Sequence, residues 1–207
     1  QHIESFFNQM ETAALGEDFT DPEKGYRKYL DLESFLRNLL VGDFCGNTDL
    51  LWSVYMYKDA KDGKLYTGPT WDHDLSFDND YRSYPVNANN DFIFLFVPSP
   101  ASDAVRDITR RIVKEDPEAK NLLAQYWNQA LEEGDLKTLP EYLDQTYVLL
   151  QESQELNFKR WNIMPYQIGA GAVDPAVYNT YEKQVQYLRD FINQRWAYMD
   201  ERINREM

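Results

Sequence analysis

The sequence has a single cysteine, few basic residues and no long apolar run. Cys45 stands alone among 207 residues, so the chain can form no internal disulfide and no zinc site built on several cysteines. No apolar run approaches the roughly 20 residues that span a bilayer, so no membrane span is predicted. With 21 Lys and Arg against 35 Asp and Glu, the net charge is −14. This charge argues against nucleic acid or an anionic membrane as partner, because both require clustered basic side chains.

The composition predicts a folded domain with a sizeable core. Hydrophobic residues make up 43% of the chain, including 5 Trp, 15 Tyr and 11 Phe. No repeat, low-complexity tract or linker interrupts the sequence, so we predict one domain over residues 1–207. The chain begins with Gln1 inside a helical pattern, without Met or a signal peptide. We interpret this as a sign of a longer parent protein.

Apolar residues recur at helical spacing in most of the chain. Asp31 and Asp116 are typical N-caps, Pro117 is typical of a first helical position, and Gly16 and Gly134 are placed to follow helix ends. The expected helices cover residues 3–14, 31–44, 102–113, 117–131, 138–161 and 178–204. Their apolar and aromatic stripes are interpreted as core.

Between the second and third helices the pattern changes to that of a small β-hairpin. Residues 52–58 alternate aromatic and branched side chains, residues 64–70 do so more weakly, and residues 59–63 have turn chemistry. The predicted fold class is therefore mainly α with a small β-hairpin. The irregular stretch 78–90 that follows is interpreted equally well as a functional loop or as ordinary surface. The apolar run 92–97 is expected to be a buried strand or an extended segment.

Four polar residues flank this hairpin. Asn47 and Asp49 come directly before it, and Asp72 and Asp74 directly after it. Because a hairpin returns its end close to its start, Asp49 and Asp72 are expected to be neighbours, and Asp72 and Asp74 share a face if the strand continues through them. Carboxylates brought together repel unless a cation separates them, and oxygen ligands suit Mg²⁺, Mn²⁺ or Ca²⁺. The alternative from spacing alone is that these are turn caps and solvated loop acids.

Beyond these four residues, several runs of sequence carry a family resemblance. Together they resemble the CotH kinase family, the spore-coat protein H type of atypical protein kinase. The runs are YLDLESF at 29–35, GNTD at 46–49, YMYK at 55–58, GPTWDHDLSF at 68–77 and YLRDFINQR at 187–195, followed by Trp196.

This resemblance implies a kinase-like C-lobe that transfers the γ-phosphate of ATP to Ser or Thr of a protein substrate. Asp49 would be the catalytic aspartate, and Asp72 would hold Mg²⁺ or Mn²⁺ against the phosphates. Asn47 would help to bind the nucleotide, and Asn47 and Asp74 would support the metal. The chain starts near the family's C-lobe helices, so the nucleotide-binding lobe would lie in the parent and this chain alone would be inactive. The family further implies a bacterial extracellular, cell-surface or spore-coat location.

Three positions depart from the family pattern. Ser53 stands where an Asn is common, Asp78 where a Gly is expected, and His73 in place of an aromatic residue. We interpret His73 as a packing residue. Ser53 and Asp78 favour the second hypothesis, a non-catalytic structural or interaction module of a coat or cell surface. A plain Ca²⁺ module is a third hypothesis, although no EF-hand loop is present.

Overall fold

The protein is mainly helical and carries one small β-hairpin. The computed structural model describes residues 2–51, 54–79, 92, 103–166 and 173–206. Its elements are α1 (His2–Leu15), the 3-10 helix η1 (Tyr26–Lys28), α2 (Leu32–Cys45), β1 (Met56–Lys58), β2 (Leu65–Thr67), α3 (Asp103–Glu115), α4 (Pro117–Glu132), α5 (Asp135–Leu149), α6 (Gln151–Arg160) and α7 (Tyr181–Glu206). The predicted fold class is confirmed.

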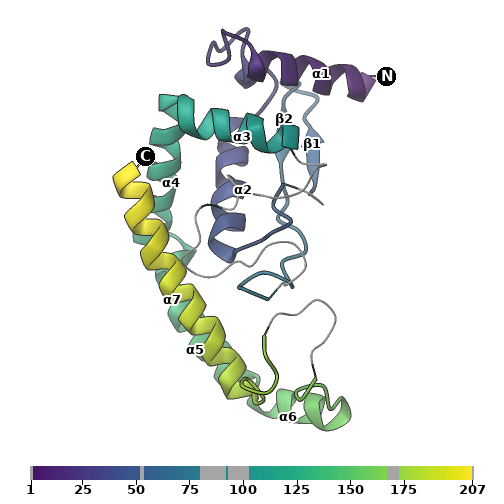
Figure 1. Ribbon diagram of the computed structural model, residues 1–207, viewed down its shortest axis with the longest axis vertical. Helices are drawn as coiled ribbons and strands as arrows, with labels where there is room; N and C mark the ends of the chain where they lie inside the picture. The colour runs from purple at the N-terminus through teal and green to yellow at the C-terminus, as the bar shows by residue number, and fades with distance from the viewer. Residues whose placement is uncertain (1, 52–53, 80–91, 93–102, 167–172, 207) are drawn as a thin grey trace.

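Helix α2 lies at the centre of the arrangement. It packs against α4 and α7 on one side and against β2 on the other, while α1 packs on α3 and η1. Figure 1 shows α7 running beside α4 and α5, with α6 at the end of the molecule opposite to α1. The C-terminal end of α2 therefore lies between α7 and the residues that connect α2 to the hairpin.

Most predicted helix ends are confirmed, because their capping chemistry is local. The Asp31 side chain accepts the Ser34 amide at the start of α2, and Asp116 accepts the amides of Glu118 and Ala119 at the start of α4. These bonds satisfy amide groups that have no partner within the helix.

The single helix predicted over residues 138–161 is wrong. The structure has two helices, α5 and α6, separated at Leu150, where ψ is 0°. The Leu150 amide still donates to Thr146 O and its carbonyl still accepts from Gln154 N, at 3.0 and 2.8 Å. Because the hydrogen bonds continue through the bend, the helical spacing continues too, and no Gly or Pro marks the break.

The hairpin is confirmed, but its strands are shorter than predicted. Three residue pairs form the antiparallel ladder, with Tyr57 opposite Tyr66. Gly63 closes the turn with a φ of 73°, a left-handed conformation that glycine adopts without strain. Strand β2 also bonds to the segment before α2, since Leu65 N donates to Tyr29 O at 2.7 Å and Leu65 O accepts Asp31 N at 2.9 Å. The predicted strand residues 52–53, the run 93–97 and the stretch 80–90 lie outside the described residues.

The apolar stripes of α2, α3, α4 and α7 form the core, as predicted, and their fully buried members include Leu36, Leu39, Ile112, Val113, Leu123, Trp127, Met199 and Ile203. The stripes predicted in residues 3–14 and 138–161 are partly wrong, because Ile3, Phe7, Leu150 and Trp161 are exposed. In the part of the chain that the structure describes, none of the helices combines the length and the apolar character that a membrane span requires.

Candidate functional site

The first half of the candidate site is the loop that follows α2. Gly46 ends the helix in the left-handed conformation, with a φ of 67°. The Asn47 side chain then bends the loop, because its Oδ1 accepts the Asp49 amide at 2.9 Å. This bond places Asp49 at a defined, partly exposed position. Asn47 thus shapes the loop, and its predicted part in holding a metal or nucleotide stays a prediction.

Close packing beneath this loop fixes it to α2. A Cβ atom at Gly42 would lie only 2.2 Å from Leu50 Cδ1, so the missing side chain leaves the space that Leu50 fills. Leu50 is buried, and it directly follows Asp49. The backbone of Asp49 is therefore held on one side by the Asn47 side chain and on the other by the buried Leu50.

The second half of the site is the segment 71–78, which is not a strand. The expectation that the second strand continues through Asp74 is wrong, because β2 ends at Thr67 and Asp72 has a φ of 59°. A left-handed residue breaks the two-residue alternation of a strand. Asp72 and Asp74 are nevertheless close enough for the Asp74 carboxyl group to raise the pKa of Asp72.

The acids on the two sides of the hairpin are close enough to interact. The pKa of Asp72 is raised, first by the hydrogen bond and charge of Asp74 and further by the charge of Asp49. Both effects disfavour the ionised form of Asp72. The charge of Asp49 thus acts on Asp72, and the expectation that the two carboxylates are direct neighbours stays a prediction.

Two further contacts join the loop and the segment. Phe77 N donates to Cys45 O at 2.6 Å, and Asn47 Nδ2 lies 3.4 Å from His73 Nε2. Burial lowers the pKa of His73, which favours the neutral ring whose nitrogen can accept the Asn47 amide. His73 is half-buried and contacts the loop, in agreement with its interpretation as a packing residue.

Asp78 takes the conformation that a glycine would adopt more easily. Its φ is 62°, and that of Phe77 is 61°. The Asp78 carboxylate accepts the Tyr187 hydroxyl of α7 at 2.5 Å, while burial raises the pKa of Asp78. The side chain that stands where a glycine was expected thus makes a contact to α7.

A buried ion pair below the site was not predicted from the sequence. Arg195 of α7 pairs with Asp43 of α2, and the side chains of both residues are 0% exposed. The guanidinium also donates from Nε to Asp43 O at 3.1 Å. A signal was present, because Arg195 lies three residues after Ile192 and four before Met199 and so falls on the apolar face of its helix.

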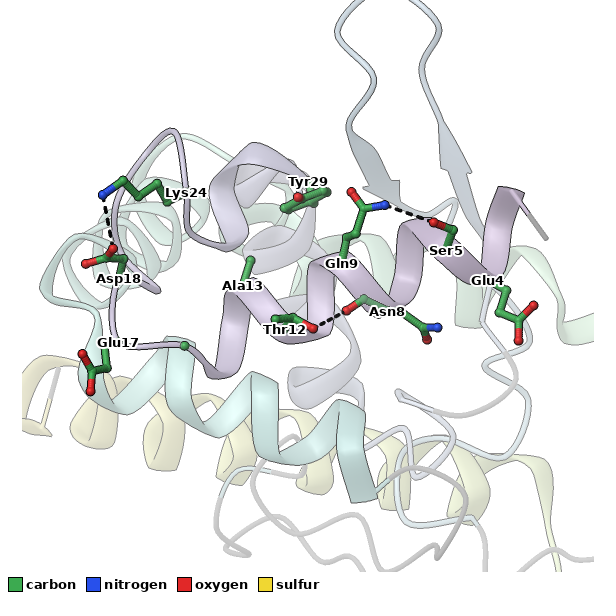
Figure 2. A pocket seen from close by; sticks show the side chains of 11 residues that line it. Glu4, Ser5, Asn8, Gln9, Thr12, Ala13, Glu17, Asp18, Lys24 and Tyr29 are labelled. Atoms are coloured by element: carbon green, nitrogen blue, oxygen red, sulfur yellow. Dashed lines mark hydrogen bonds and ion pairs between the residues drawn. The ribbon is translucent and has the colours of Figure 1, made fainter.

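The site is an open surface rather than a deep pocket. The hollow bordered by Asn47, Tyr55, Trp71 and His73 measures only about 10 Å³, which is room for about one water molecule. A hollow of about 790 Å³ lies elsewhere, along the polar side of α1, and none of the four predicted residues lines it. Figure 2 shows its Gln9–Ser5 and Lys24–Asp18 contacts, which are local to α1 and the loop after it.

Removing the charge of Asp72 is expected to stabilise the protein in the absence of divalent cations. The folded-state pKa of Asp72 is raised, so its ionisation weakens the fold as the pH rises through that value. Asp72→Asn should therefore raise the Tm at pH 7 with a chelator present, and this gain should vanish below the ordinary pKa of an aspartate. Thermal melts from pH 3 to 8 test this. Asp18→Asn, which changes an exposed loop acid, is the control, and an Asp72→Asn variant that melts lower at pH 7 would contradict the expectation.

Comparison with known proteins identifies the family. The family model described as CotH kinase protein matches residues 1–199. The chain therefore belongs to the CotH kinase family, as the sequence motifs predicted. The comparisons with curated proteins and with solved structures returned no match.

Proposed function

We propose that this chain carries the catalytic aspartate and the metal-holding acids of a phosphotransferase that moves the γ-phosphate of ATP to Ser or Thr of a protein. Membership of the CotH kinase family supports a kinase-like function. The observation that carries the proposal is that the loop after α2 and the segment 71–78 are joined, through Phe77 N and Cys45 O at 2.6 Å and through Asn47 Nδ2 and His73 Nε2 at 3.4 Å. These contacts support a common site for the acids of the two segments.

In this proposal the acids have separate roles. Asp49 accepts the proton of the acceptor hydroxyl or orients that hydroxyl for attack. Asp72, supported by Asp74, holds Mg²⁺ or Mn²⁺, and the loop shaped by Asn47 keeps Asp49 in place. When bound, the metal neutralises the charge of the phosphates. Without a metal, the same carboxylates would repel ATP.

The donor chemistry fits such a metal. Asp49, Asp72 and Asp74 offer only oxygen ligands, and their mutual repulsion is relieved by a cation. Among the residues that the structure describes, no group of three or more His, Cys, Asp or Glu is placed to hold a metal ion. In our proposal Mg²⁺ would therefore be held by one or two carboxylates together with substrate phosphates and water.

The intact parent protein provides the test. We expect phosphate incorporation from ATP that requires Mg²⁺ or Mn²⁺. Asp49→Asn should lower kcat by about 10²–10⁴-fold, the usual contribution of a general base, and Asp72→Ala should abolish transfer. Asp18→Asn is the matched control. Transfer at the wild-type rate by Asp72→Ala would refute the assignment.

The second candidate is a non-catalytic module of a coat or cell surface. Two observations favour it: the absence of a ready-made metal group among the described residues and the replacement of the family glycine by Asp78. Thermal-shift titration of the intact parent distinguishes the two. Stabilisation by ATP that depends on Mn²⁺ supports the kinase, whereas no shift at saturating concentrations supports the module. Both candidates fit a bacterial extracellular, cell-surface or coat location.

A further inference from the structure

One face of α7 contacts both acid-bearing parts of the candidate site. Tyr187, Phe191 and Arg195 are four residues apart, so their side chains form a single stripe along the helix. Each of the three has a partner outside α7, in α2 or in the segment 71–78. We call these three residues the α7 stripe.

The C-terminal end of the stripe, Arg195, holds the start of the loop that carries Asp49. Arg195 pairs with the Asp43 carboxylate and also donates to its carbonyl oxygen. The same carbonyl accepts Gly46 N at 3.1 Å, in the turn that ends α2. One guanidinium therefore fixes both the side chain and the backbone from which the GNTD loop begins.

The N-terminal part of the stripe, Tyr187 and Phe191, holds the residues that follow Asp72 and Asp74. The Phe191 ring meets the Phe77 ring edge to face, with centroids 5.9 Å apart. Tyr187 donates its hydroxyl to the Asp78 carboxylate at 2.5 Å. These contacts lie at two consecutive residues in left-handed conformations, which local sequence preference alone would not maintain.

We propose that the α7 stripe sets the relative position of the two acid-bearing segments and that Tyr187 and Arg195 are positioning residues for the site. The two segments are also tied to each other through Phe77 N and Cys45 O. Loosening one segment is therefore transmitted to the other. The inference concerns the same site as the proposed function. It rests on that function only where it predicts an effect on metal and nucleotide binding.

Two conservative variants test the stripe while preserving its packing. Tyr187→Phe keeps the ring and removes the hydroxyl, and Arg195→Lys keeps the charge and removes the fork of donors. Tyr142→Phe, at an exposed tyrosine of α5, and Arg205→Lys, at an exposed arginine near the end of α7, are the matched controls. The variants are made in the 207-residue chain for hydrogen exchange and in the intact parent for metal binding.

Hydrogen exchange without metal or nucleotide is the first measurement. Each stripe variant should speed exchange about tenfold in both segments, 43–51 and 71–78, the factor that corresponds to one lost charge-assisted hydrogen bond. In the stripe variants the amides of α5 should exchange at the wild-type rate. In both control variants all amides should do so. Faster exchange only beside the altered residue, or equally throughout the chain, would overturn the proposal. If Arg195→Lys does not fold, Tyr187→Phe alone decides by its effect on residues 43–51.

Mn²⁺ affinity in the presence of ATP is the second measurement, made on the intact parent. Tyr187→Phe and Arg195→Lys should each weaken it, and the double variant should lose less than the product of the two factors, because both act on one geometry. Side chains two turns apart on a helix would otherwise act independently. No Mn²⁺ binding by the wild type would refute the proposed function, whereas the exchange data would still decide on the stripe.

Discussion

Replacing Arg195 by methionine is expected to lower the free energy of unfolding by about 3–5 kcal/mol. The change leaves the Asp43 carboxylate buried without its cation, and both side chains are 0% exposed in the wild type. It also removes the donor to Asp43 O at the end of α2. Urea unfolding of the single variant, followed by circular dichroism, measures the loss.

A double variant separates the loss of a partner from the value of the pair itself. Asp43→Leu combined with Arg195→Met removes both charges, so it should recover much of the stability that the single change removes. Arg205→Met changes an exposed arginine on the same helix and should stay within about 0.5 kcal/mol of wild type. A loss of less than about 1 kcal/mol in the free energy of unfolding of Arg195→Met would contradict the expected cost of leaving Asp43 buried without its cation.

Replacing Asp116 by alanine is expected to have an effect of similar size, about 3–5 kcal/mol, because a buried carboxylate with several partners is lost. Asp116 is 1% exposed and accepts the Tyr26 hydroxyl at 2.6 Å. It also pairs with Arg27 and caps α4 through Glu118 N at 2.9 Å. Removing the carboxylate leaves the buried Tyr26 hydroxyl and the first turn of α4 without an acceptor.

The dependence on pH gives the Asp116 prediction a second readout. Burial acts to raise the pKa of Asp116, but hydrogen bonds from Tyr26 and Arg27 outweigh it and lower the pKa. The stability from these bonds is therefore present above the ordinary aspartate pKa and is lost as the pH falls through the lowered value. Asp116→Asn keeps a cap but no charge, so the difference between wild type and variant should shrink on acidification. A constant difference from pH 7 to 2 would contradict the assignment.

Local chemistry made much of the helical fold predictable. Asp31 and Asp116 begin their helices as expected, because an N-cap bond joins residues only two or three positions apart. The hairpin turn at Gly63 is equally local. The break at Leu150 was missed because its hydrogen bonds continue through it. The end of β2 at Thr67 was missed although Gly68, with a φ of 121°, and Pro69 follow it directly. The left-handed conformation of Asp72 was missed because no glycine stands there.

Only part of the candidate site could be predicted from the sequence. The motifs GNTD and WDHD, with the hairpin between them, were sufficient to predict that the two segments meet, as the bond from Phe77 N to Cys45 O shows. The same motifs could not show that Asn47 bends the loop with its own side chain. They also could not show that Tyr187 and Arg195 reach both segments from a helix more than a hundred residues later.

The sequence by itself determined the helical class and the family, and it supplied the candidate acids, because these depend on spacing and motif within short stretches. Only the tertiary structure decided how the acids are held. Burial of Asp43 with Arg195 and the contact of Tyr187 with Asp78 join residues far apart in the chain. Such pairings depend on how α7 packs against α2, and that packing is fixed by the whole core rather than by any local pattern.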